Sequence, residues 1–304
     1  MRRGTWVFTR ARVSLVGSKA CLLTAEKEFV LGGAQIGQSY GKPMPGPADD
    51  EGNSRSLLGD AWNGGFTSVD TARVYGRSES WIGQLEWRGK VYTKLDPTAD
   101  PLTSLEASLR TLNRASVEGL LLCHDSRSLR RYSKNSWLRH IDSMKNRVGR
   151  FGLSLYQDQF DQPLQAIKEL EIIQIPFNVL SEGPSQRHVE SWQENGKLIY
   201  ARSIFAQGLL LDGPASVKDQ DFLRALKNLK GVCRELNLSA GELALRWALG
   251  KTFIHGLIVG ASTGLEVQQI MSWAEHGPLG TTEVEVIDKL MAEFRRPFDM
   301  RVLK

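Results

Sequence analysis

Residues 66–83 read FTSVDTARVYGRSESWIG, an apolar run that ends in a group of polar residues. The run begins like a buried strand, and within a few residues the chain places an aspartate, two arginines, a tyrosine and a glutamate. Gly76 favours a turn in this polar stretch. Surface loops also collect polar residues. The five-residue spacing of Asp70 and Tyr75 therefore does not by itself distinguish a functional site from a surface loop, and the rest of the chain must decide.

Eight short apolar runs, this one included, recur near residues 29, 66, 90, 118, 150, 171, 197 and 255. Segments with helical features separate them. Alternating strands and helices imply parallel strands joined by right-handed crossovers, and eight such units close a barrel. A doubly wound open sheet is disfavoured because GGAQIG, after the first run, lacks the Gly-x-Gly-x-x-Gly spacing. The sequence therefore predicts an α/β fold, a single-domain (β/α)8 TIM barrel.

The helical segments carry local signals. Thr103 and Glu106 have the spacing of a capping box before a helix, and Ser239 and Glu242 repeat it. A last apolar set at helical spacing predicts a closing helix packed on the barrel: Ile287, Leu290, Met291 and Phe294.

Length and composition fit this fold. The 304 residues are 41% hydrophobic and suit one barrel of roughly 250 residues. A run of about 18 apolar residues, as a membrane-spanning helix needs, does not occur in the sequence. Cys21, Cys123 and Cys233 lack any paired spacing, which argues against a zinc site or a disulfide framework. We predict a cytoplasmic protein without a metal site.

The positive charge lies at the start of the chain. Residues 1–25 hold five basic residues and no acid, which accounts for the whole net charge of +5. The rest of the chain is neutral, so we expect no nucleic-acid partner. The basic segment resembles an organellar transit peptide in composition, and the alternative is a short hairpin or extension. We assign 1–28 to a basic N-terminal extension or hairpin and 29–304 to the barrel.

Polar residues end three successive apolar runs. In a barrel of this kind the active site lies at the carboxyl ends of the strands. Asp70 ends the second run, Lys94 the third and His124 the fourth, with Tyr75 just behind Asp70. These four side chains would therefore converge.

Their convergence has a chemical meaning. A tyrosine hydroxyl has an ordinary pKa of about 10, too high to release a proton readily at neutral pH without a nearby ammonium. Lys94 would supply that charge, with Asp70 as its buried counter-ion, and His124 would orient a carbonyl oxygen. The set suits a proton donor for carbonyl reduction and requires no metal.

The motifs DTARVYG, RSE with IG two residues later, YTKL and LLLCHD resemble those of the aldo-keto reductase superfamily over residues 29–275. The opening VLGGAQIGQSYG looks like a bacterial branch of sugar-related or uncharacterised oxidoreductases. Members of the superfamily are (β/α)8 barrels that reduce carbonyls with a nicotinamide cofactor. The resemblance implies that Asp70, Tyr75, Lys94 and His124 form the catalytic tetrad, with Tyr75 as general acid.

The resemblance also implies a cofactor site. Ser154 and Gln174 match positions that bind the carboxamide, although Leu155 replaces the usual asparagine, and Arg202 stands where many members stack a tyrosine on the nicotinamide. The remaining implied contacts are Ser203, Phe205, Gln207, Gly208, Leu209, Gly260, Ser262, Thr263, Glu266 and Gln269. The family implies NADPH as cofactor. NADH is the rival, because Glu266 stands about where an arginine for the 2′-phosphate falls.

Two other functions are compatible with the sequence. A lysine inside a barrel can form a Schiff base, so Lys94 permits an aldolase-like lyase. A cofactor-binding regulatory subunit without catalysis is the second alternative. We expect a small-molecule carbonyl compound as substrate, and the sequence names neither that compound nor the oligomeric state.

Overall fold

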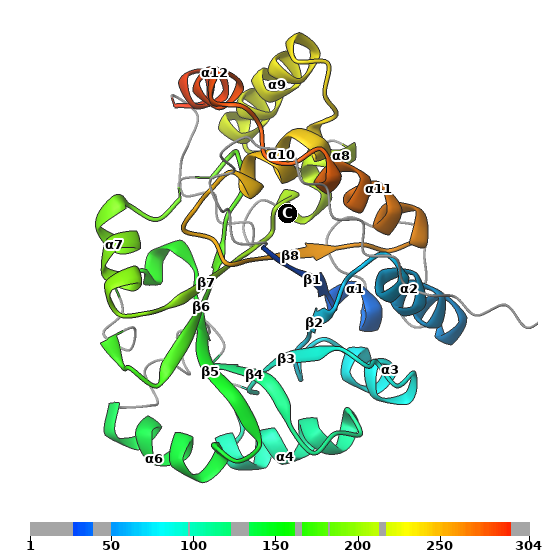
Figure 1. Cartoon of the computed structure of the whole chain (residues 1–304), viewed down its shortest axis with the longest axis vertical. Helices are drawn as coiled ribbons and strands as arrows, with labels where there is room; N and C mark the ends of the chain where they lie inside the picture. The colour runs from blue at the N-terminus through cyan, green and yellow to red at the C-terminus, as the bar shows by residue number, and fades with distance from the viewer. Residues whose placement is uncertain are drawn as a thin grey trace, which may run out of the picture.

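The eight apolar runs form eight parallel strands that close into one barrel in chain order, β1 to β8 (Figure 1). The computed structural model describes residues 27–38, 50–96, 98–122, 134–161, 166–181, 183–212 and 217–292. The basic segment predicted as an extension or hairpin lies outside these ranges, apart from its last two residues. The strands are β1 (Glu28–Gly32), β2 (Ser68–Asp70), β3 (Lys90–Lys94), β4 (Val117–Leu122), β5 (Val148–Ser154), β6 (Leu170–Pro176), β7 (Leu198–Arg202) and β8 (Gly256–Gly260).

Helices surround the strands, as the alternation in the sequence predicted (Figure 1). They are α1 (Ala34–Gly37), α2 (Glu51–Asn63), α3 (Ser78–Gln84), α4 (Pro101–Thr111), α6 (Lys134–Met144), α7 (Gln186–Glu194), α8 (Leu209–Asp212), α9 (Gln220–Glu235), α10 (Ala240–Leu249), α11 (Gly264–Glu275) and α12 (Thr281–Met291). The single-domain (β/α)8 barrel is confirmed. Within the described ranges, no helix has both the length and the apolar character to cross a bilayer.

Helix starts were predicted only in part. Ser239 caps α10, because its side chain accepts a hydrogen bond from the backbone N–H of Glu242. The capping box at Thr103 is wrong: the N-cap of α4 is Asp100, whose side chain accepts from the Thr103 N–H. Pro101 explains the difference, since its fixed φ suits the first helical position and its missing N–H costs nothing there.

The closing helix is α12, which packs against α9 on the outside of the barrel (Figure 1). Its side chains Ile287 and Met291 are buried, as their spacing predicted. The helix ends at Met291, and Phe294 lies outside the described residues.

Two hydrophobic clusters hold the barrel together. The larger lies between the strands and the surrounding helices, and the smaller fills the interior of the barrel. Tyr92 and Tyr200 belong to the interior cluster, with ring centroids 5.5 Å apart. A Cβ atom at Gly119 or Gly256 would overlap these rings, so glycines on β4 and β8 make the room that the tyrosines fill.

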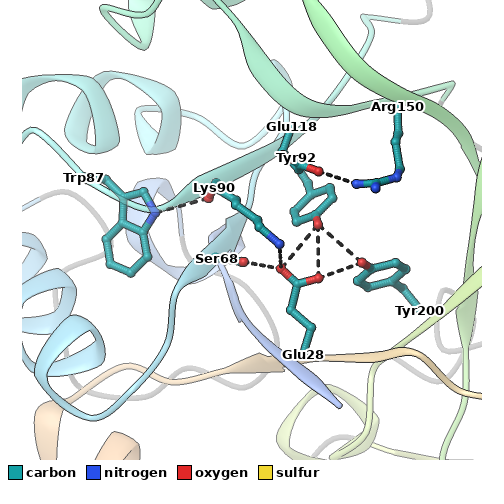
Figure 2. Close-up of polar contacts among 8 residues, drawn as sticks. All are labelled: Glu28, Ser68, Trp87, Lys90, Tyr92, Glu118, Arg150 and Tyr200. Carbon is teal, nitrogen blue, oxygen red and sulfur yellow. Dashed lines mark hydrogen bonds and ion pairs between the residues drawn. The ribbon is translucent and has the colours of Figure 1, made fainter. Parts of the chain in front are cut away.

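The amino-terminal end of the barrel carries a polar cluster around Glu28 (Figure 2). The Glu28 carboxylate accepts hydrogen bonds from Ser68, from Tyr200 at 2.7 Å and from Tyr92 at 3.1 Å, and Lys90 Nζ lies 3.5 Å away. Burial raises the pKa of both phenols, so they stay protonated donors. Burial alone would raise the pKa of Glu28, but the hydrogen bonds from Ser68 and Tyr200 and the charge of Lys90 lower it below its ordinary value.

Replacing Glu28 by glutamine is expected to reduce the free energy of unfolding at neutral pH by about 1–3 kcal/mol, because three donors lose a charged acceptor. A carboxyl whose pKa is lower in the folded state stabilises the fold above its unfolded pKa of about 4.3, and this contribution is lost as the pH falls through the folded value. Urea unfolding from pH 7 to pH 3 should therefore show a smaller acid-induced loss for Glu28→Gln than for wild type.

Glu51→Gln is the matched control, because Glu51 pairs with Arg55 in an exposed i, i+4 contact on α2. An exposed pair of this kind should change the unfolding free energy by less than about 1 kcal/mol. If Glu28→Gln is as stable as this control at neutral pH, the polar cluster does not stabilise the barrel.

Candidate active site

A cavity of about 360 Å³ opens at the carboxyl ends of the strands. Asp70 and Tyr75 from β2 and its loop line it together with residues that follow β1, β7 and β8. Residues at the starts of α10 and on α11 complete the wall. The cavity thus lies at the end of the barrel where the strand-end rule placed an active site.

Asp70, which lines this cavity, forms a buried ion pair with Lys94, which does not line it. Lys94 Nζ lies 2.5 Å from Asp70 Oδ2 and also donates to the Thr71 carbonyl oxygen at 3.0 Å. The two side chains are 2% and 5% exposed. They meet because β2 and β3 are adjacent parallel strands, so residues at their carboxyl ends lie at one edge of the barrel. A buried ammonium is tolerated only with such partners.

The loop after β2 holds Tyr75 next to this pair. Lys94 Nζ lies 5.1 Å from the centroid of the Tyr75 ring. The Tyr75 N–H donates to the Ala72 carbonyl oxygen at 3.0 Å, which closes a turn. Gly76 follows with φ +55°, and a Cβ there would overlap the carbonyl oxygen of Gly37, so only glycine lets the chain turn this close to α1.

Arg73 and Glu79, which lie in residues 66–83, also have structural roles. Glu79, buried at the start of α3, accepts a hydrogen bond from Thr93 on β3 at 2.7 Å. Arg73 pairs with Glu79 at 2.9 Å and donates to Thr111 at 3.2 Å. These contacts tie the loop that carries Tyr75 to the strand that carries Lys94. His124, the fourth predicted member of the site, lies outside the described residues.

Ser154 and Gln174 form a hydrogen-bonded chain that reaches Asp70. Ser154 Oγ donates to Gln174 Oε1 at 3.0 Å, and Gln174 Nε2 donates to Asp70 Oδ1 at 2.9 Å. All three side chains are buried: Ser154 ends β5, Asp70 ends β2, and Gln174 lies beside Ser154 on β6. The two carboxylate oxygens of Asp70 therefore accept from different partners, Lys94 on one and Gln174 on the other, which fixes the plane of the carboxylate.

Arg202 ends β7 and lines the cavity. Its guanidinium donates to the Leu155 carbonyl oxygen at 3.1 Å and lies 4.8 Å from the centroid of the Tyr156 ring. A planar guanidinium stacks well on aromatic faces. Arg202 therefore places a planar cation at the position where, by the resemblance, many family members stack a tyrosine on the nicotinamide.

The loop after β7 has an unusual backbone. Among the described residues six that are not glycine have a positive φ, and three of them lie in this loop: Ser203, Ala206 and Gln207. Such conformations cost of order 1–3 kcal/mol each and cluster at ligand sites. Ser203, Phe205, Gln207 and Gly208 line the cavity, whereas Leu209 does not. The N–H groups of Gly208 and Leu209, two of the implied cofactor contacts, bond to carbonyl oxygens within the loop.

The end of β8, the turn after it and the first half of α11 form another part of the wall. Gly260, Ser262, Glu266 and Gln269 line the cavity. Thr263 does not line it and instead caps α11, because its hydroxyl accepts from the Glu266 N–H at 3.2 Å. A carboxylate oxygen of Glu266 accepts from the Ser262 N–H at 2.6 Å.

Several lining residues were not predicted. Gln35 lines the cavity and donates to Ser262 Oγ at 2.9 Å. It follows the end of β1, so applying the strand-end rule to the first run would have found it. Ser239 and Gly241 at the start of α10 line the cavity too, and the sequence signalled only a helix cap there. Trp273 lies seven residues after Glu266, on the same face of α11.

In the parts of the chain that the structure describes, no group of three or more histidine, cysteine, aspartate or glutamate side chains is placed to hold a metal ion.

Comparison with known proteins supports the fold and identifies the family. A search of curated protein sequences finds no match to the chain. The fold is similar to that of aldo-keto reductase AKR11C1 from Bacillus halodurans in its holo form, with a TM-score of 0.73 and 20% identity over 86% of this chain and 91% of that chain. The family model described as the aldo/keto reductase family matches residues 28–292, and the chain belongs to this family.

Proposed function

We propose that this protein reduces a small aldehyde or ketone to the alcohol with a reduced nicotinamide cofactor, or catalyses the reverse oxidation with the oxidised cofactor. The family supports an oxidoreductase acting on carbonyls. The observation that carries the proposal is the arrangement of Lys94, which contacts the Asp70 carboxylate and the Tyr75 ring at the cavity.

The cavity suits a nicotinamide dinucleotide by its chemistry. Ile204, Phe205, Ile258, Ile270 and Trp273 supply apolar and aromatic surface, as flat rings require. Hydroxyls, side-chain amides and one guanidinium supply donors for ribose and phosphate oxygens. The polar lining residues that would hold the cofactor are Gln35, Arg202, Ser203, Gln207, Ser262 and Gln269. We retain Ser154 and Gln174 as proposed carboxamide contacts, and their hydrogen bonds link that contact to Asp70.

When bound, the cofactor supplies the hydride. Tyr75 gives its hydroxyl proton to the carbonyl oxygen, and the ammonium of Lys94 stabilises the resulting phenolate. Asp70 keeps Lys94 charged in its buried position. We assign His124 to orienting the carbonyl oxygen, as the sequence predicted.

The Schiff-base alternative has less support. A lysine nucleophile must reach the substrate as a neutral amine. Lys94 is 2% exposed, does not line the cavity, and donates to both Asp70 and Thr71. These contacts suit an electrostatic role for Lys94 better than a nucleophilic one.

A spectrophotometric screen tests the proposal. We expect aldehydes, ketones or sugars to accelerate consumption of NADH or NADPH by the purified protein, followed by the loss of absorbance of the reduced nicotinamide. If calorimetry detects cofactor binding but no carbonyl compound or alcohol is turned over, the result would favour a non-catalytic regulatory subunit. Substrate-dependent trapping by borohydride on Lys94 would instead favour the lyase.

A further inference from the structure

We propose that Glu266 makes this protein select NADH over NADPH. The inference rests on the proposed function and names its cofactor. It reverses the preference that the family resemblance implied, and it follows from the position, charge and hydrogen bonds of one carboxylate.

The lining residues come from two parts of the fold. Tyr75 and Asp70 belong to β2 and the loop after it, and the nicotinamide must lie near them to be within reach of a carbonyl that accepts the Tyr75 proton. Gly241 and Trp273 belong to α10 and α11, two helices that pack against each other outside the strands. The adenosine half of a dinucleotide therefore extends toward α10 and α11, where Glu266 stands in the first turn of α11.

The charges that line the cavity are unevenly placed. The lining residues that the structure describes include one cation, Arg202, and two carboxylates, Asp70 and Glu266. Arg202 is held at the end of β7 by the Leu155 carbonyl oxygen and by the ring of Tyr156. Among the described residues that line the cavity from the β8 turn and from α10 and α11, Glu266 is the charged one, and none is an arginine or lysine.

The start of α11 would otherwise suit an anion. Helix N-termini bind phosphate through unpaired N–H groups and the helix dipole. Here the chain's own carboxylate takes that place: a Glu266 oxygen accepts from the Ser262 N–H at 2.6 Å, and the Glu266 N–H donates to Thr263 Oγ1 at 3.2 Å. The Ser262 hydroxyl accepts from Gln35 at 2.9 Å. The backbone N–H of Ser262 is therefore already paired with the chain's own carboxylate.

The two cofactors differ at this one group. A phosphate monoester carries about −1.5 to −2 charges at neutral pH, and a like charge beside Glu266 is unfavourable. NADH has a ribose 2′-hydroxyl instead, which can donate to a carboxylate, the contact that acidic residues make in other NAD sites. The carboxylate thus attracts one cofactor and repels the other.

Isothermal titration calorimetry with NADH and NADPH tests the inference without turnover. For the wild type we expect the dissociation constant for NADPH to exceed that for NADH by roughly tenfold or more. Glu266→Gln keeps an acceptor for the Ser262 N–H and removes the charge, so the ratio should fall several-fold, mostly through tighter NADPH binding. Glu275→Gln, on the same helix but exposed and away from the cavity, should leave the ratio at the wild-type value.

The possible results separate the inference from the proposed function. Wild-type protein that binds NADPH as tightly as NADH, or a ratio that Glu266→Gln leaves unchanged, would overturn the role of Glu266 while leaving carbonyl reduction intact. Binding of neither nucleotide would overturn the proposed function, and the inference with it. A smaller ratio at high salt in the wild type would support the electrostatic origin, because salt screens repulsion between partly exposed charges.

Discussion

Tyr75→Phe is expected to lower kcat/KM for carbonyl reduction by about 10²- to 10⁴-fold, the usual contribution of a positioned general acid. The ring keeps its position beside Lys94, because the loop that carries it is held by backbone hydrogen bonds and by the Arg73–Glu79 pair. Only the proton donor is removed. Cofactor binding should therefore persist, and calorimetry should give a dissociation constant close to that of wild type.

Tyr92→Phe is the matched control, since it removes a phenol hydroxyl at the opposite end of the barrel, next to Glu28. It should leave kcat/KM unchanged even if it lowers the melting temperature. Undiminished turnover by Tyr75→Phe would contradict the assignment of the general acid. Equal losses in both tyrosine variants would point to a general loss of folded protein instead.

The strands were predictable because the barrel buries both faces of each strand. A parallel strand covered on both sides reads as a nearly continuous apolar run, and the chain has eight of them in the observed order. The carboxyl ends of parallel strands meet at one end of a closed barrel. The meeting of Asp70 with Lys94 therefore followed from the sequence once the fold was recognised.

Contacts between distant strands were not predictable in the same way. Gln174 reaches Asp70 from β6, and Gln35 reaches Ser262 from α1, the short helix after β1. Such contacts depend on how the barrel closes and on the side-chain rotamers, neither of which has a periodic signal in the sequence. Asp100 is a different case, because the cap and the following proline were present in the sequence but were outweighed by the Thr-x-x-Glu spacing.

The position of the Glu266 carboxylate shows what a family pattern leaves out. The sequence placed an acid about where an arginine would favour NADPH. It did not show that the Glu266 carboxylate accepts a hydrogen bond from the Ser262 N–H at the start of α11. In the structure this carboxylate therefore occupies a position that could otherwise bind an anion. The proposed role of His124 still rests on the sequence alone, since that residue lies outside the described ranges.

Lys94→Met is expected to abolish turnover and to lower the free energy of unfolding by about 3–5 kcal/mol, because it leaves the Asp70 carboxylate buried without its cation. Methionine nearly matches the lysine side chain in length, so packing against the surrounding strands is largely kept. The hydrogen bond from Gln174 remains on the other carboxylate oxygen and offsets only part of the loss. Urea unfolding at neutral pH measures the change.

The double variant Asp70→Asn, Lys94→Met separates the structural role of the lysine from its catalytic one. Removing both charges eliminates the uncompensated buried carboxylate, so the unfolding free energy should recover most of the loss seen in Lys94→Met. Turnover should not recover, because Tyr75 still lacks the neighbouring ammonium that stabilises its phenolate. A double variant that regains both stability and turnover would show that Lys94 serves the fold alone, whereas one that stays as unstable as the single variant would show that the 2.5 Å ion pair does not account for the cost of the substitution.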